Sequence, residues 1–248
     1  MDKTSREEPV SELDVEPRGL VHIECVTNGP IETNTYFACS RDEVVVIDPA
    51  WDGEKLARDF MEQHPRVRIV AIACTHGHAD HVGGVAGMRR FLGDDVPFLI
   101  SRAERDFIPG AIGSMREMWG IETEDPGEPT CLLDEGDRID FGGCSLQALS
   151  VPGHTPGGMV LFTATEGGNF AFVGDTLFPG GHGRTDLEGG DEHAVIQSLG
   201  KIGSMLPEDT LCLIGHGRAT TVAEEREQNF FMRRALKRLA RKRSAAAE

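Results

Sequence analysis

The 248-residue sequence predicts an α/β (α+β) protein with a four-layer αββα architecture, in which two stacked sheets carry helices on both outer faces. Two observations predict this fold. Strand-like segments with two helices among them precede a second set of strands with two helices, and histidines or aspartates follow the ends of several strands. The order of elements predicts the layers, and the residues at the strand ends strengthen the prediction because together they suit one shared metal site.

The individual elements follow from hydrophobic patterning. Runs rich in Val, Ile, Phe and Thr are predicted as strands. These runs cover residues 21–27, 35–40, 43–48, 67–75, 97–101, 138–141, 144–151, 158–165, 169–174 and 210–214. Helices are predicted at 53–63, 80–91, 191–199 and 222–242.

One domain is expected over residues 21–248, since a chain of this length can bury one substantial core. Residues 1–20 are polar and acidic, lack the features of a secretory signal, and are predicted to form a loose leader. A C-terminal helix is expected from about residue 222. Segment 102–130 has only partial helical periodicity, and two interpretations stay open: a lid over a pocket, or ordinary core packing.

The formal net charge of −16 limits the partners. An acidic surface repels nucleic acid and anionic membranes, and no apolar run approaches the ~20 residues that span a bilayer. We therefore expect a small-molecule substrate, no nucleic acid and no membrane, while the oligomeric state stays open. The Lys and Arg residues crowded between 233 and 243 are interpreted as the solvated face of a terminal helix.

The six cysteines form no CxxC pair and mostly lie in apolar runs. This usage is typical of buried thiols in a reducing compartment, and it favours neither a disulfide framework nor a zinc ribbon. We therefore expect a cytoplasmic protein.

Four potential metal ligands follow the apolar run 67–74 within six residues: His76, His78, Asp80 and His81. At the end of a strand, alternation points His76 and His78 the same way, and the following turn brings Asp80 and His81 next to them. Imidazole and carboxylate groups suit zinc, iron or manganese. Core packing explains such a cluster poorly, because each buried polar group would need a satisfied partner.

Three more strand ends repeat the design with a single residue each, His154, Asp175 and His216. Considered separately, each would more often support a structure than bind a metal. Together with the first cluster they supply five histidines and two aspartates, enough for two ions roughly 3.5–4 Å apart that share a bridging ligand. The sequence therefore predicts a centre for two divalent ions, zinc in the first instance, with iron or manganese as alternatives.

Four segments resemble, in order and spacing, the metal-binding motifs of the metallo-β-lactamase superfamily, particularly its glyoxalase II-like metallo-hydrolase branch. They are THGHADHVGG (75–84), VPGHTPGG (151–158), FVGDTLFPGGHGR (172–184) and IGHGRATT (214–221). The resemblance covers about residues 21–229 and implies the αββα fold.

The resemblance also implies residue roles. His76, His78 and His154 would hold the first metal, Asp80, His81 and His216 the second, and Asp175 would bridge them. Asp48 would lie behind the ligands, and Arg184 and Asp186 match a GRTD segment seen in several branches. His182 would either touch substrate or belong to a surface loop; both interpretations stay open.

The leading functional hypothesis is hydrolysis of a thioester by a metal-bridging hydroxide that Asp80 orients as the catalytic residue. Only about one helix follows His216, whereas glyoxalase II has a helical domain there that binds glutathione, so the thiol stays open. One alternative is a mononuclear iron persulfide dioxygenase with His76, His154 and Asp175 as ligands. A lactonase or β-lactamase of the same fold is the other. No GxSxG or P-loop motif supports a different chemistry.

Overall fold

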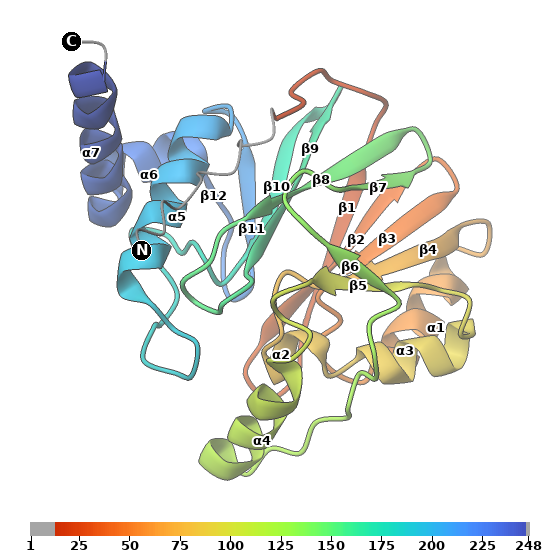
Figure 1. The fold of residues 1–248 in the computed structure, drawn as a ribbon. Coiled ribbons are helices and arrows are strands. Elements are labelled where there is room, and N and C mark those ends of the chain that lie inside the picture. Colours follow the sequence, from red (N-terminus) through yellow and green to blue (C-terminus); the bar gives the residue numbers. More distant parts are fainter. Residues whose placement is uncertain (1–12, 247–248) are drawn as a thin grey trace, which may run out of the picture.

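The structure, a computed structural model of the chain, describes residues 13–246 (Figure 1). Two six-stranded sheets face each other. The first contains β1 (His22–Asn28), β2 (Thr33–Ser40), β3 (Glu43–Ile47), β4 (Arg68–Ala73), β5 (Phe98–Ser101) and β6 (Cys131–Leu133), in that order. The second contains β12 (Thr220–Thr221), β11 (Leu211–Ile214), β10 (Gly168–Gly174), β9 (Met159–Thr165), β8 (Cys144–Ser150) and β7 (Arg138–Phe141).

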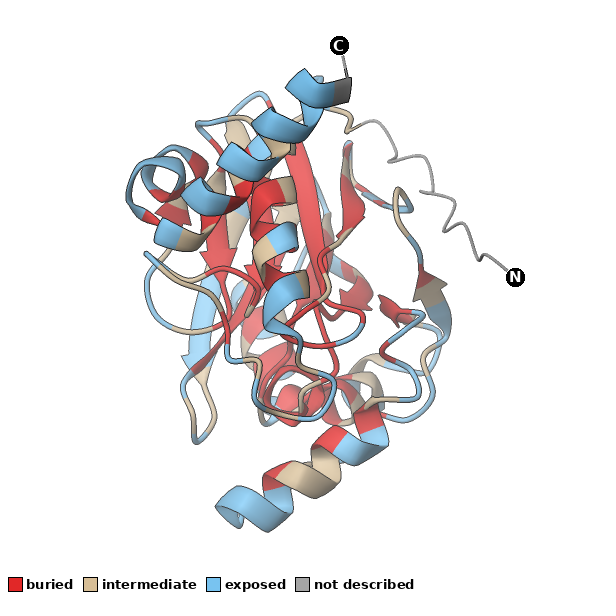
Figure 2. Cartoon of the chain, turned by 60° about the vertical axis from the view of Figure 1, so that its left-hand side comes forward, coloured by how far each residue is buried: buried red, intermediate tan, exposed pale blue. Residues whose placement is uncertain are grey.

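Helices cover the outer faces of both sheets. The helices are α1 (Gly53–Gln63), α2 (Ala79–Val82), α3 (Val85–Leu92), α4 (Ile108–Trp119), α5 (Glu192–Met205), α6 (Val222–Gln228) and α7 (Phe230–Ala246). Helices α1 and α3 pack on the first sheet and α5 and α6 on the second, while α7 packs on the outside of α5 and α4 projects from the edge of the sandwich (Figure 1). Figure 2 shows mostly buried strands behind helices whose outer sides are exposed. The predicted four-layer αββα fold is therefore confirmed.

A continuous apolar layer joins the two sheets. Val45 and Ala73 of the first sheet pack with Leu146, Leu161 and Phe172 of the second, and all five are buried. Strands β3, β4, β5 and β6 run parallel, because a helix crosses over between each consecutive pair. Their carboxyl ends therefore lie at the same edge of the first sheet.

Several elements differ from the sequence predictions. The helix expected at 80–91 is divided into α2 and α3 at Gly83 and Gly84, where a Cβ on Gly84 would lie 2.7 Å from the Pro49 carbonyl oxygen. The helix expected at 222–242 is divided at Asn229, whose side chain accepts hydrogen bonds from the N–H groups of Phe231 and Met232 and so begins α7.

Helix α4 and the short strands β6 and β12 have no counterpart among the predicted elements. The α4 sequence contains Pro109, Gly110 and Gly113, which weaken a helical pattern, although Pro109 is tolerated in the first turn where it lies. Strands of two or three residues are too short to show a two-residue period. The predicted α5 is correct in place, but it extends to Met205.

Residues 1–12 of the expected leader lie outside the described residues, and residues 13–20 run along the second sheet. The Asp14 N–H donates to the Gln147 side chain, and the Arg18 N–H donates to the carbonyl of Ala164. Within residues 13–246, no helix is long and apolar enough to cross a membrane. The six cysteines are free; three are buried, but Cys25 and Cys131 are exposed, which the expectation of buried thiols missed.

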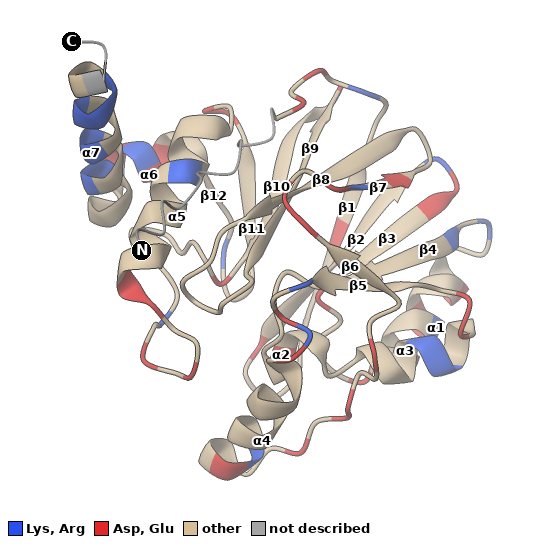
Figure 3. Ribbon diagram, viewed as in Figure 1, with Lys and Arg blue, Asp and Glu red and all other residues tan. Residues whose placement is uncertain are grey.

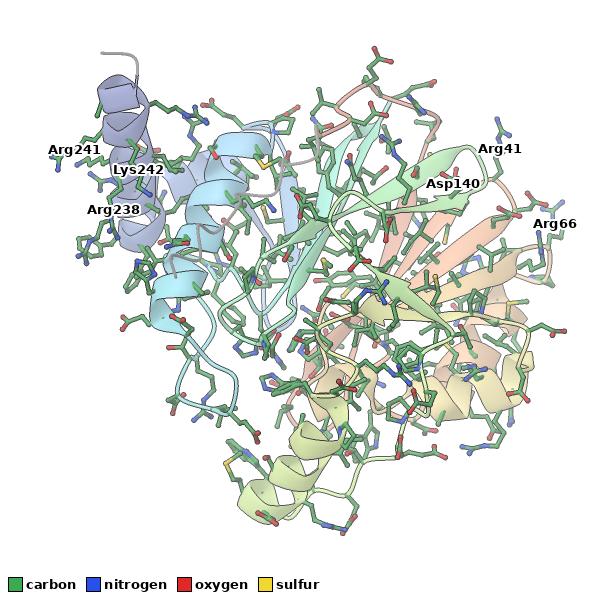
Figure 4. All side chains as sticks on the ribbon, in the orientation of Figure 1. Arg41, Arg66, Asp140, Arg238, Arg241 and Lys242 are labelled. Atoms are coloured by element: carbon green, nitrogen blue, oxygen red, sulfur yellow. The ribbon has the colours of Figure 1, made fainter. Side chains whose placement is uncertain are left out.

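Helix α7 separates apolar and basic faces. Met232 and Ala235 pack against Gly203 and Gly200 of α5. The Lys and Arg residues lie on the opposite, exposed face, where Figure 3 shows them concentrated and Figure 4 shows Arg238, Arg241 and Lys242 pointing outward. This arrangement agrees with a solvated basic face on a packed helix.

Candidate metal centre

Seven predicted ligands converge on one edge of the sandwich. The cluster from His76 to His81 follows β4 and runs into α2. His154 follows β8, Asp175 follows β10, and His216 follows β11. One sheet thus supplies four of the side chains and the other sheet supplies three, so packing of the two sheets brings them together.

The first group consists of His76, His78 and His154, whose candidate ligand atoms all lie within 4.8 Å of one another. His78 Nδ1 is 2.9 Å from His154 Nε2. Burial lowers the pKa of all three imidazoles, and lowers that of His78 to about 3. Neutral imidazoles have the free lone pair that a metal requires.

The second group consists of Asp80, His81 and His216, again within 4.8 Å of one another. Asp80 Oδ2 lies 3.3 Å from His81 Nε2 and 3.2 Å from His216 Nε2. Burial opposes the ionisation of Asp80, but the charge of His81 and the hydrogen bonds from His216 and His81 outweigh it and lower the Asp80 pKa. Burial lowers the His216 pKa, but the neighbouring carboxylates of Asp175 and Asp80 outweigh it and raise this pKa to about 10.

Asp175 lies between the two groups. Its Oδ2 is 3.7 Å from His154 Nε2 and 3.4 Å from His216 Nε2, while its Oδ1 is 3.4 Å from His81 Nε2. Asp175 also forms a candidate ligand group with His76 and His81. One carboxylate therefore reaches side chains of both groups, as a bridging ligand must.

Buried atoms without partners test whether these residues fit metal ions. His76 Nε2, His81 Nε2 and Asp175 Oδ1 are buried, and none of them forms a well-aligned hydrogen bond within the described part of the chain, although His81 Nε2 lies within 3.4 Å of Asp80 and Asp175 oxygens. Buried polar atoms are rarely left unpaired, because each costs about 1–3 kcal/mol. A Cβ at Gly215 would lie 2.0 Å from Asp175 Oδ1, so the glycine leaves room at the centre. The residues present fit divalent cations.

Hydrogen bonds behind the ligands fix their orientation. Asp48, predicted to lie behind the site, is buried and accepts from the Thr75 N–H, from Thr75 Oγ1 and from His81 Nδ1. His154 Nδ1 lies 2.7 Å from the Arg184 carbonyl, and His216 Nδ1 lies 3.1 Å from the Ile31 carbonyl. In each imidazole the bonded Nδ1 leaves Nε2 directed at the centre.

Two further residues support the site, and neither was predicted. Glu104 is fully buried and accepts from the N–H of Gly77 at 2.6 Å and of Gly157 at 2.5 Å, so it ties the His76–His78 loop to the His154 loop. Burial raises its pKa. Thr33 donates a 2.9 Å hydrogen bond to Asp80 Oδ2. Glu104 lies among charged residues typical of a surface, and nothing in the sequence marks Thr33.

A cavity of about 530 Å³ opens over the centre. Side chains of the metal centre form its floor, α4 forms one wall, and residues 184–188 form another. Arg184 and Asp186 line this second wall and pair through two hydrogen bonds of 2.8 Å. His182 does not line the cavity; its ring packs on Phe231 of α7 at 4.5 Å between centroids.

The four-layer fold and the ligand-rich edge define a class of αββα proteins with a candidate metal centre between the sheets. The family model of the metallo-beta-lactamase superfamily matches residues 28–216. The chain belongs to this superfamily, as its four motifs suggested.

Individual relatives agree with this assignment. A Bacillus subtilis protein described as probable metallo-hydrolase YqgX is 34% identical over 206 residues, which cover 82% of this chain and 94% of that protein. The hydroxyacylglutathione hydrolase GloC of Haemophilus influenzae is 30% identical over 188 residues, which cover 75% and 86%.

Two solved structures are similar along nearly their whole length. The BLEG-1 B3 metallo-beta-lactamase superimposes with a TM-score of 0.76 and 31% identity, covering 85% of this chain and 99% of that one. TTHA1623 in a di-iron-bound form gives a TM-score of 0.74 and 35% identity, covering 84% and 99%.

Proposed function

We propose that the protein is a hydrolase that uses two divalent metal ions to cleave a thioester. The observation that carries this proposal is the position of Asp175, within 3.7 Å of His154 and 3.4 Å of His216, between two complete ligand groups. A dinuclear centre of this kind supplies activated water near neutral pH and stabilises the developing oxyanion.

The proposed ligands follow the two groups. His76, His78 and His154 would hold one ion, Asp80, His81 and His216 the other, and Asp175 would contact both. Mixed nitrogen and oxygen donors suit zinc, with iron or manganese as alternatives. The relative TTHA1623 is known in a di-iron-bound form, which supports a two-ion centre and keeps iron as an option here.

Hydrolysis of a thioester consumes one water molecule and gives a carboxylic acid and a thiol. The water oxygen forms a bond to the thioester carbonyl carbon, the carbon–sulfur bond breaks, and the thiolate leaves with a proton that comes from the water. Asp80 is the catalytic residue of the proposal: Thr33 donates to its Oδ2, His216 Nε2 lies 3.2 Å from the same oxygen, and the carboxylate would orient the attacking water. The relative GloC, described as a hydroxyacylglutathione hydrolase, supports a thioester as the substrate.

The iron dioxygenase alternative fits the site less well. It would need only His76, His154 and Asp175, whereas Asp80, His81 and His216 form a second ligand group at the same centre. A mononuclear mechanism gives these three residues no role as metal ligands.

Thiol release from a panel of thioesters tests the proposed function, with oxygen uptake on glutathione persulfide measured in parallel. We expect metal-dependent thiol release that falls by about 100-fold or more in Asp80→Asn. Asp140→Asn, an exposed carboxylate on β7 (Figure 4), is the control and should keep full activity. Oxygen uptake without thioester cleavage, or full activity in Asp80→Asn, would contradict the proposal.

A further inference from the structure

The α4 wall of the cavity is a nearly continuous apolar stripe. Ala111, Ser114, Met115, Met118 and Trp119 line the cavity, and this spacing places them on one face of the helix. Four of the five are apolar. The stripe begins beside the metal centre, since the Phe107 ring lies 5.5 Å from that of His78 between centroids.

The outer half of this stripe is only partly covered by protein. Ala111 and Met115 are 7% and 8% exposed, whereas Met118 and Trp119 are 53% and 57% exposed. Large apolar side chains that stay half exposed at a pocket mouth, in line with a buried stripe, are typical of ligand contact. Contact of this wall with a hydrocarbon group is therefore more favourable than its contact with water.

The opposite wall offers little to an anion. Beyond the proposed ligands, the charged side chains that line the cavity within residues 13–246 are Arg184, Asp186 and Glu188. Arg184 is already paired with Asp186 through two hydrogen bonds, and Glu188 adds an uncompensated negative charge. Recognition of several carboxylates or phosphates requires clustered Arg or Lys side chains. Among the described residues, this wall has only Arg184, which is already paired with Asp186.

We propose that the part of the substrate that does not react is an uncharged hydrocarbon group seated on α4 between Phe107 and Trp119. The substrate class is therefore an apolar thioester, and not a glutathione or coenzyme A conjugate. This inference deepens the proposed function and rests on it for the identity of the reacting bond. The apolar stripe and the charge of the cavity stand independently of that bond.

Unreactive thioethers test the inference without turnover. S-butyl, S-hexyl and S-octyl derivatives of N-acetylcysteamine are uncharged. The S-alkyl derivatives of glutathione have the same hydrocarbon chains, but their peptide part has two carboxylates and one ammonium group. The chain has two tryptophans, so Trp51→Phe leaves Trp119 as the fluorescent reporter at the cavity mouth. Binding is followed by this fluorescence in the protein as purified and after metal removal.

We expect the affinity of the N-acetylcysteamine series to rise about 2- to 4-fold for each added CH₂. The glutathione counterpart should bind at least about 10-fold more weakly at equal chain length. Met118→Ser, on the stripe, should weaken S-octyl binding about 3- to 10-fold. Phe230→Ser is the matched control, because Phe230 is 63% exposed but lies on α7 away from the cavity.

Affinity that does not depend on chain length, or glutathione derivatives that bind as tightly as the uncharged ones, would overturn the inference. Since the thioethers have no scissile bond, its failure is distinct from that of the proposed function. A protein that binds them as described but cleaves no thioester contradicts the proposed function alone.

Discussion

The Nδ1 atom of His81 lies 2.9 Å from Oδ2 of Asp48, and neither side chain reaches solvent to a significant extent. The same carboxylate also accepts two hydrogen bonds from Thr75, directly before His76. Asp48 therefore holds both ends of the main ligand loop without being a ligand itself. Its role is to direct His81 Nε2 at the centre and to keep that imidazole in one tautomer.

Replacing Asp48 tests this positioning role. In Asp48→Ala, His81 can rotate and Thr75 loses its acceptor, so we expect metal affinity to fall about 10- to 100-fold. Competition with a chromogenic chelator measures this affinity. Asp42→Ala removes an exposed carboxyl close by in the sequence and should leave affinity unchanged; equal affinity in both variants would show that Asp48 does not orient the ligands.

Replacing Glu104 tests the link between the His76–His78 and His154 loops. Glu104→Ala leaves the N–H groups of Gly77 and Gly157 buried without an acceptor, at a cost of about 1–3 kcal/mol each. Glu104→Gln retains one acceptor oxygen, so about half of this loss is expected.

Urea unfolding of the metal-free protein measures these changes in the free energy of unfolding. Glu117→Ala, an exposed carboxyl on α4, should have little effect. If Glu104→Ala were as stable as the native chain, the hydrogen bonds from Gly77 and Gly157 to Glu104 would not stabilise the fold.

The lack of space at Gly215 gives a third prediction. In Gly215→Ala the new methyl group would lie 2.0 Å from Asp175 Oδ1 and 2.7 Å from His81 Cε1, so Asp175 must move. We expect loss of at least one bound metal and about 100-fold or more of the activity. In the control Gly181→Ala, the new methyl group has no atom within 4 Å, so this variant should retain its bound metal and its activity. Metal analysis and thiol release would detect the difference between the two variants.

Metal removal should lower stability, because Asp80, His76, His81 and His154 then remain buried, and Asp175 nearly so, without their cations. At a free metal concentration about 1,000 times the dissociation constant, binding adds roughly 4 kcal/mol to the free energy of unfolding. Thermal unfolding with and without a chelator measures this change. An unchanged Tm, despite measured metal loss, would mean that the cations do not stabilise the fold.

The αββα fold could be predicted because periodicity identifies most strands and because the His and Asp residues mark four strand ends. Positions that depend on contacts across the sandwich could not. Glu104 looks like a surface carboxylate until Gly77 and Gly157 are seen to share it. Helix α4 was missed since Pro109 and two glycines weaken its helical signal, although it forms one wall of the cavity.

The number of metal ions per chain tests the central claim most directly. Elemental analysis of the purified protein should give two divalent ions, falling to about one in His78→Ala and in His216→Ala, because each variant breaks a different ligand group. His193→Ala, an exposed histidine on α5, should keep two. One ion in the native protein, or two ions retained in His216→Ala, would contradict a dinuclear centre.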